Sequence, residues 1–259
     1  MSAKFRRNHA SARGQSGFGR IMIFALVAVI SLYFLSRAIG NLDLEDNLKK
    51  NINFGSFDSL ETLVESSQYK VQVIDHGYFE LGYDEEIEQA RYVGYGLNSE
   101  MLSLKNVPRT DWFSEDKKVE SRSSHHRDFT NSGYSRGHLV PAADMAHSEK
   151  SMATTFLMSN ISPQLRHFNG GVWRELEELV RDWVYKHDAL YIISGPLFLE
   201  DQVEYIGKTS QIAVPSHFFK ALLTENWEGV AFVVPHALST ESIEKYMVSI
   251  DSLERLSQL

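Results

Sequence analysis

The feature that most limits how this chain can fold is a run of 16 residues without a charge, from Ile21 to Ser36. Arg20 and Arg37 flank the run, and residues 1–37 hold six Lys or Arg and no acidic residue. Because so long an apolar segment must leave water, it belongs in a membrane or inside protein. We therefore predict a basic tail over residues 1–20, a transmembrane signal anchor over 21–40, a linker or stalk over 41–69 and one globular domain over 70–259.

Three other interpretations of the apolar run stay open. It could be a cleaved signal peptide, although no small-x-small cleavage site follows it. It could be a mitochondrial import sequence with an inner-membrane anchor, because the start of the chain is rich in arginine and free of acids. It could also be a buried helix of the globular domain. An anchor with its basic flank in the cytoplasm places the domain outside the cytoplasm, with the mitochondrial inner membrane as the alternative.

The composition excludes several kinds of chemistry. The chain has no cysteine, so it forms no disulfide, thiolate metal site or cysteine nucleophile. Six of its 26 Lys and Arg residues lie within the first 37, so the remainder carries 20 basic and 34 acidic residues, a net charge of −14. Since phosphate contacts dominate affinity for nucleic acid, a nucleic-acid-binding protein with this balance needs a local basic cleft in an acidic body.

The hydrophobic pattern of the globular part mixes strand and helix periods. Apolar and polar residues alternate, or apolar residues run together, in stretches that predict strands at 71–75, 78–83, 91–97, 189–194, 217–223 and 229–235. A 3.6-residue period predicts a helix over 168–184. We also expect a long polar loop over 103–133, a strand ending near Tyr134, a short helix over 148–155 and a brief strand over 156–159. This mixture predicts an α+β domain with a mainly antiparallel sheet.

The residues Tyr134 to Asp144, Tyr-Ser-Arg-Gly-His-Leu-Val-Pro-Ala-Ala-Asp, carry the strongest chemical signal. They place a phosphate-binding arginine, Arg136, beside a flexible glycine and a proton acceptor, His138. A free histidine titrates near pH ~6.5 and can take a proton from water at neutral pH. A lone histidine is more often a surface or core residue, but the neighbouring arginine and glycine favour His138 as a general base.

Asn169 and Glu177 supply oxygen atoms that suit a hard metal ion. Mg²⁺ keeps several waters and needs only one or two protein ligands, so an amide oxygen of Asn169 can suffice. The alternative role for Asn169 is an N-cap, since it begins the predicted helix. On a regular helix Glu177 lies about 80° around and about 12 Å along from Asn169, which favours contact with a metal-bound water. Its alternative is a solvated helix residue.

Further candidates surround this set. Arg109 and Arg136 are candidates for binding the phosphate and its developing charge, with a plain loop cation as the alternative for Arg109. Arg181 could pair with Glu177, four residues before it, or bind a phosphate. Asp144 could orient a ring or a water, or cap a turn, and Asn160 is expected to brace a loop. Together these residues predict metal-assisted hydrolysis of a phosphodiester.

Three segments resemble the DNA/RNA non-specific endonucleases of the ββα-metal type, a family that includes secreted bacterial nucleases and mitochondrial endonuclease G. They are Tyr134–Asp144, Ser159–Gln164 and Phe168–Glu177, in the family's order. The resemblance covers roughly residues 70–255 and implies the ββα-metal nuclease fold. It also implies that His138 activates water, that Asn169 alone binds one Mg²⁺ (with Mn²⁺ as a substitute), and that Glu177 reaches the ion through water.

The same resemblance places Arg109, Arg136 and Arg181 at the phosphate and implies products with 5′-phosphate ends. One departure concerns Ser135, where the family usually has aspartate; a hydroxyl cannot replace the carboxylate charge. We expect Ser135 to support the site, with specificity or the geometry of the metal-bound water different from that of relatives with aspartate.

These observations predict a membrane-anchored, Mg²⁺-dependent, sugar-non-specific nuclease. Its partners are DNA or RNA and a membrane reached through residues 21–40, and a homodimer is open. The alternative is a catalytically degenerate, membrane-tethered module that binds nucleic acid or protein, suggested by Ser135 and the acidic domain. A third interpretation is a phosphodiesterase for another substrate.

Overall fold

The computed structural model describes residues 69–104, 107–224 and 228–259. The predicted tail and anchor, and the linker up to residue 68, lie outside these described residues. Within the described residues, none of the helices combines the length and the apolar character needed to cross a membrane.

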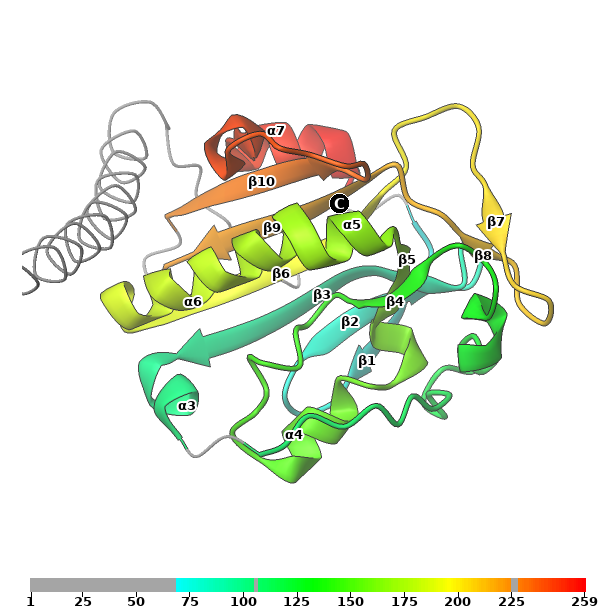
Figure 1. Ribbon diagram of the computed structural model, residues 1–259, viewed down its shortest axis with the longest axis horizontal. Coiled ribbons are helices and arrows are strands. Elements are labelled where there is room, and N and C mark those ends of the chain that lie inside the picture. The colour runs from blue at the N-terminus through cyan, green and yellow to red at the C-terminus, as the bar shows by residue number, and fades with distance from the viewer. Residues whose placement is uncertain (1–68, 105–106, 225–227) are drawn as a thin grey trace, which may run out of the picture. The chain divides into compact units, whose positions relative to one another are not determined.

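A seven-stranded sheet forms the centre of the described domain (Figure 1). Its strands pair in the order β1-β2-β3-β6-β9-β10-β11, and every pairing between neighbours is antiparallel. The bounds are β1 Gln72–Asp75, β2 Glu80–Asp84, β3 Gln89–Asn98, β6 Ala189–Leu197, β9 His217–Leu223, β10 Gly229–Pro235 and β11 Met247–Val248. The expected α+β class with an antiparallel sheet is confirmed.

Two helices cover opposite faces of this sheet. Helix α6, Arg174–His187, runs across one face in Figure 1 and buries its apolar stripe there. On that side Phe218 of β9 contacts Trp173, which directly precedes α6. The next residue, Phe219, points the other way and joins a cluster with Ile250 and Leu253 of α7, Ile250–Ser257. This alternation follows from the two-residue period of a strand and gives each face its own core.

Several shorter helices and strands lie outside the seven-stranded sheet. The helices are α3 Ser99–Ser103, α4 Glu149–Thr154 and α5 Arg166–Phe168, with 3₁₀ turns η1 His126–Phe129, η2 Met158–Asn160 and η4 Ile243–Tyr246. The small strands are β4 Ser135–His138, paired with β5 Ile161–Gln164, and β7 Tyr205–Ile206, paired with β8 Ile212–Ala213. As expected, α4 occupies the short helical segment, with Ser148 as its N-cap.

The predicted position of the strand near Tyr134 is wrong. The motif does not follow a strand: Ser135 to His138 are themselves β4, in register from Ser135 opposite Gln164 to His138 opposite Ile161. The pairing depends on Gly137, because a Cβ at that position would lie 2.1 Å from Cδ of the Gln164 side chain. The sequence Ser-Arg-Gly-His has little strand propensity of its own, so the partner strand decides the conformation.

Three other predicted boundaries are corrected. Residues 156–159 form no strand but lead into η2, and β5 begins only at Ile161. Strand β6 continues through Pro196, which lies opposite Phe218. The predicted helix over 168–184 runs from Arg166 to His187 in three parts, with the π-helical segment η3, Asn169–Trp173, between α5 and α6. Gly171 is non-helical there (φ −109°, ψ −117°), and glycine weakens a helix at such a point.

Candidate functional site

The β4–β5 ribbon and the helical segment from α5 to α6 meet at a cavity of about 470 Å³. Five of the predicted site residues line it, although they come from four separate stretches of the chain: Arg109, Ser135, Asn169, Glu177 and Arg181. The other lining residues are Ala143, Arg166, Gly170, Arg174 and Glu178. The cavity therefore gathers amide, carboxylate and guanidinium groups at one place.

The amide of Asn169 is held in one orientation by the ribbon. Its Nδ2 donates to the Ser135 hydroxyl at 3.1 Å, and that hydroxyl donates to the backbone oxygen of Gln164 at 2.7 Å. Within the described residues, no protein donor reaches the Oδ1 of Asn169. The oxygen that could bind a cation is therefore left without a protein partner at the edge of the cavity.

The N-cap role for Asn169 is wrong. Asn169 has helical backbone angles (φ −59°, ψ −45°) and continues directly from α5, whose N-cap is Leu165. Leu165 in turn donates its backbone N–H to Nε2 of His236 at 2.7 Å, while Nδ1 of that ring lies 2.8 Å from the backbone oxygen of Pro215. This anchor at the start of α5 fixes the position of the turn that carries Asn169.

His138 is buried at the end of β4 and does not line the cavity itself. Only 8% of the residue is exposed, and its ring lies 5.6 Å from that of Phe113 and 4.9 Å from that of Phe156. Burial, helped by the positive charges of Arg109 and Arg136, lowers its pKa to about 3. The imidazole is therefore neutral at physiological pH and able to accept a proton.

Nε2 of His138 is buried and has no hydrogen-bond partner among the described residues. An unpaired buried polar atom costs about 1–3 kcal/mol unless a bound water or ligand satisfies it. The rings of Phe113 and Phe156, which lie beside His138, each also contact the guanidinium group of an arginine. Arg136 lies with Cζ 4.4 Å from the centre of the Phe113 ring, and Arg109 lies 5.3 Å from that of Phe156. Cation–π contacts thus hold both guanidinium groups close to the imidazole.

Glu177 lies in the first turn of α6, and its environment opposes ionisation. Burial raises its pKa to about 7; the positive charge of Lys220 opposes the rise, and the negative charge of Asp144 adds to it. Lys220 is a fully buried residue of β9 with its Nζ 4.9 Å from the Trp173 ring, and burial lowers its pKa. The angle estimated from a regular helix between Asn169 and Glu177 does not apply, because the kink at Gly171 lies between them.

Arg181 pairs with Asp144 and not with Glu177. Its Nη1 donates to Oδ1 of Asp144 at 2.9 Å, and the Tyr95 hydroxyl donates to the other carboxylate oxygen at 2.7 Å. Asp144 therefore orients a guanidinium group and not the ring of His138. Asn160 holds the loop that follows β4. Its Oδ1 accepts from the backbone N–H of Val140 at 2.9 Å, two residues after His138.

Sequence reasoning missed Arg166, Arg174 and Lys220. The two arginines are exposed and line the cavity from either side of Asn169. Arg166 precedes the predicted start of the helix at residue 168, and Arg174 lies on that helix among other charged residues, so spacing did not single out either one. Lys220 gives no local signal, because a lysine within an apolar strand shows its partners only in three dimensions.

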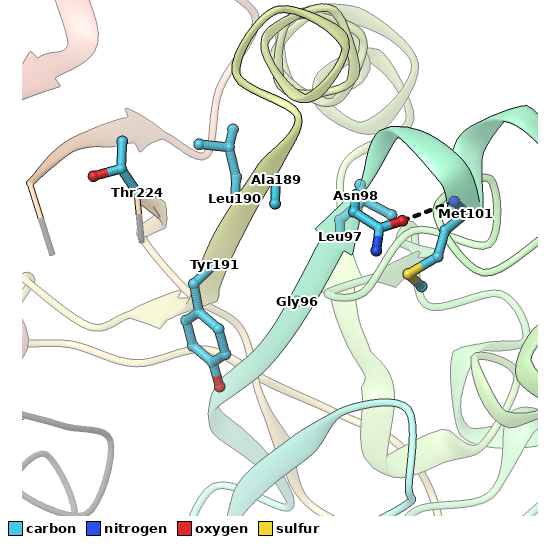
Figure 2. A pocket seen from close by; sticks show the side chains of 8 residues that line it. All are labelled: Gly96, Leu97, Asn98, Met101, Ala189, Leu190, Tyr191 and Thr224. Atoms are coloured by element: carbon cyan, nitrogen blue, oxygen red, sulfur yellow. Dashed lines mark hydrogen bonds between the residues drawn. The ribbon is translucent and has the colours of Figure 1, made fainter. Parts of the chain in front are cut away.

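A second cavity, of about 440 Å³, lies where β3 ends and α3 begins (Figure 2). Its lining is mostly apolar, and Figure 2 shows Asn98 turned to the backbone N–H of Met101, from which it accepts at 2.8 Å. Asn98 is thus occupied as the N-cap of α3. The cavity offers no carboxylate, imidazole or guanidinium group, so it lacks the chemistry that the first cavity has.

The donors of the first cavity fit a hard, hydrated divalent cation. Among the described residues, no group of three or more His, Asp or Glu side chains is arranged to enclose a metal ion. Asn169 and Glu177 both line the cavity and both offer oxygen atoms. A cation that keeps most of its waters, as Mg²⁺ does, needs no more than this.

A sequence profile of the DNA/RNA non-specific endonucleases matches residues 60–259. Human "Endonuclease G, mitochondrial" is 37% identical over 198 residues, which cover 69% of this chain and 65% of that protein. "Nuclease 1, mitochondrial" of Schizosaccharomyces pombe is 28% identical over 93% of this chain and 85% of its own length. The chain thus spans just under two thirds of the human relative.

Solved structures agree with the sequence comparison. The crystal structure of the EndoG/EndoGI complex contains a chain that superposes with a TM-score of 0.66 at 28% identity, covering 75% of this chain and 89% of that one. The chain belongs to the DNA/RNA non-specific endonuclease family.

Proposed function

We propose that this member of the family is a metal-dependent nuclease that hydrolyses phosphodiester bonds of DNA, RNA or both and leaves 5′-phosphate ends. The observation that carries the proposal is the cavity, in which an amide oxygen, a carboxylate and several arginines meet beside a buried, neutral histidine. Its relatives are named endonuclease or nuclease, which supports the same class of reaction. A homodimer stays a prediction.

Asn169, and Glu177 through a water, would hold the divalent cation. When bound, such a cation neutralises phosphate charge and lowers the pKa of water. The protein's own contribution begins with orientation: the Ser135 hydroxyl fixes the amide of Asn169, and the Asp144 carboxylate fixes the guanidinium of Arg181. Preorganised groups of this kind need no rearrangement when the reaction begins.

His138 is proposed to take the proton of the attacking water. Its low pKa keeps Nε2 free to accept that proton, and the negative phosphodiester stabilises the imidazolium that forms. Arg109 and Arg136 are proposed to bind the phosphate oxygens, where charge grows in the transition state. Both arginines are already held beside His138 by the phenylalanine rings.

The test is digestion of supercoiled plasmid and of single-stranded RNA by the purified protein with Mg²⁺ or Mn²⁺, and with excess EDTA. We expect cleavage of both polymers with metal and none with EDTA. If both polymers stay intact with either metal while the protein still binds them, the degenerate binding module is the correct alternative. Cleavage of small diesters alone would favour a phosphodiesterase for another substrate.

We propose mitochondria as the location, in place of the extracytoplasmic anchor preferred from the sequence alone. Both relatives compared above carry the word mitochondrial in their names, and the first 37 residues of this chain are basic and free of acids. Residues 21–40 would then serve as the inner-membrane anchor. Cell fractionation followed by carbonate extraction separates an anchored protein from a soluble one.

The two arginines that sequence reasoning missed should set the salt dependence of binding. Replacing Arg166 or Arg174 by alanine removes one phosphate contact, so affinity for a single-stranded oligonucleotide falls and the slope of log Kd against log salt shrinks by about 0.7 for each. Fluorescence anisotropy in EDTA between 50 and 200 mM salt, roughly the range over which such contacts are lost, measures this.

Arg255→Ala is the matched control, because Arg255 is an exposed arginine on α7, outside the cavity. An unchanged slope in both cavity variants, or an equal change in the control, would show that these arginines do not contact the substrate.

The pH dependence of activity should report Glu177. A carboxyl with a pKa of about 7 takes up a proton as pH falls through 7, so kcat/KM should fall below that pH. The charge of Lys220 holds this pKa down, so Lys220→Met should raise it and move the fall in activity to higher pH. Methionine fills the space of the lysine stem without its charge.

Profiles of kcat/KM against pH for the wild type, Lys220→Met and Glu177→Gln test this assignment. Glu177→Gln should lower activity and remove the acidic fall, because its amide does not titrate. An acidic fall at the same pH in wild type and Lys220→Met would contradict the assignment to Glu177.

A further inference from the structure

Trp112 is the most exposed of the large hydrophobic side chains in the described part of the chain, with 87% of the residue open to solvent. Tryptophan buries much of its area in most folds and is enriched at binding surfaces, because its indole combines a large apolar face with one polar edge. Leaving it in water is unfavourable unless a partner covers it.

Residues before and after Trp112 hold the segment against the rest of the domain. Arg109 rests over the Phe156 ring, and Phe113 packs against the same ring with centroids 5.0 Å apart. The following residue, Ser114, donates its backbone N–H to the backbone oxygen of Phe156, and its own backbone oxygen accepts from the N–H of Met158. Trp112 is thus an exposed side chain on an anchored segment, which lowers the conformational entropy lost when it binds a partner.

The anchored segment lies at the proposed catalytic centre. Arg109, three residues before Trp112, lines the cavity, and the ring of Phe113, the next residue, contacts both His138 and Arg136. The Cα atoms of consecutive residues are about 3.8 Å apart, so the backbone of Trp112 adjoins the residue that supports the general base. Trp112 thus lies in the chain between a residue that lines the cavity, Arg109, and one that contacts His138, Phe113.

We propose that Trp112 forms a stacking subsite for an unpaired nucleobase next to the scissile phosphate, which rests on the nuclease function proposed above. Every base has a π-face, so stacking on an indole tolerates any sequence, as a non-specific nuclease requires. A base in a duplex is already stacked on its neighbours. The subsite therefore favours single-stranded or locally opened nucleic acid over intact duplex.

Nucleic acid fits this position better than a protein partner. Arg109 lies three residues before Trp112, Arg136 rests on the ring of the next residue, Phe113, and the cavity adds further arginines, so positive charge that attracts phosphate lies close to this segment. Arg109 also lies 3.6 Å from Asp111, an exposed and weak pair that a phosphate can displace.

The cleavage test uses the full chain and two single-stranded oligonucleotides. Each has one cleavable phosphodiester between phosphorothioate linkages, and one of them carries abasic tetrahydrofuran residues on both sides of it. We expect Trp112→Ala to lower kcat/KM on the base-containing oligonucleotide about tenfold and to leave the abasic one nearly unchanged. Trp112→Phe should keep most of the activity, since its ring still stacks. Tyr205→Ala, at an exposed aromatic residue of β7, is the control.

A binding test keeps the subsite separate from catalysis. In EDTA, titration with the base-containing oligonucleotide should quench tryptophan fluorescence in the wild type but not in Trp112→Phe, and the abasic oligonucleotide should quench neither. If the wild type cleaves nothing but shows this quenching, the nuclease function fails and the subsite stands. Equal effects of Trp112→Ala on both oligonucleotides, or no quenching that depends on Trp112, would overturn the subsite.

Discussion

Replacing His138 by alanine lowers kcat/KM for plasmid and RNA by about a thousandfold, the range expected when a general base is lost. Substrate binding should change little, because the arginines proposed to bind the phosphate keep their contacts with Phe113 and Phe156. Steady-state kinetics on single-stranded RNA and nicking of supercoiled plasmid measure the loss. It should appear in kcat and leave KM close to the wild-type value.

Stability separates a catalytic role of His138 from a structural one. The folded protein keeps this ring neutral, with a pKa of about 3 against 6.5 in an unfolded chain. Only the unfolded state takes up the proton between these values, so this histidine makes the fold less stable as pH falls below about 6.5. His138→Asn should therefore be less sensitive to acid than the wild type in thermal unfolding between pH 4 and 7, roughly the titration range of the ring.

His187→Ala serves as the control for this variant, because His187 is an exposed histidine in the last turn of α6. A His138→Ala protein that folds and retains more than a tenth of wild-type activity, roughly two orders of magnitude above the expected residual, would remove His138 as the general base.

Several residues in and beside this cavity could be predicted from the sequence because they lie in short contiguous motifs. Arg136 and His138 are two residues apart, and Asn169 and Glu177 lie within one predicted helix, so local spacing identified them. The conformation of those motifs could not be predicted in the same way. Ser135 to His138 form a strand only because β5 pairs with them. The absence of a side chain at Gly137 leaves the space that the Gln164 side chain occupies.

The contacts that tune the site lie further apart. Asp144 and Arg181 are 37 positions apart in sequence, and the charge of Lys220 acts on Glu177 of α6 from strand β9 of the sheet. A four-residue spacing on a helix suggested Glu177 as the partner of Arg181. Asp144 takes that place because its loop and Tyr95 bring a second carboxylate to the same guanidinium. Such choices depend on tertiary packing, which a local pattern does not contain.

Replacing Asn169 by alanine should abolish metal-dependent cleavage, with kcat lowered by at least about a hundredfold at a Mg²⁺ concentration that saturates the wild type. Asn169 provides an amide oxygen that no protein donor occupies in the described part of the chain. The side chain caps no helix, so its removal costs little stability. Calorimetric titration with Mn²⁺ should show weaker binding, and a higher metal concentration should be needed for half-maximal activity.

Two companion variants separate the oxygen from its support. Asn169→Asp keeps an oxygen atom at the same place, so it should retain more metal binding than Asn169→Ala. Ser135→Ala leaves the amide intact but removes the hydroxyl that accepts from Nδ2, so it should raise the metal requirement by about tenfold with little loss of kcat at saturation. Metal binding should be weakened most in Asn169→Ala and less in the other two variants, because Asn169 is the proposed ligand and Ser135 only orients its amide.

Asn98→Ala is the matched control, since it removes the same side chain from the N-cap of α3 beside the other cavity. It should lower thermal stability by about 1 kcal/mol through the lost cap and leave the metal requirement of cleavage unchanged. Asn169→Ala should show the opposite pattern, with its stability kept and its metal requirement for cleavage raised. If Asn169→Ala cleaves with the wild-type metal requirement, the cation binds elsewhere, and the carboxylate of Glu177 becomes the first group to examine.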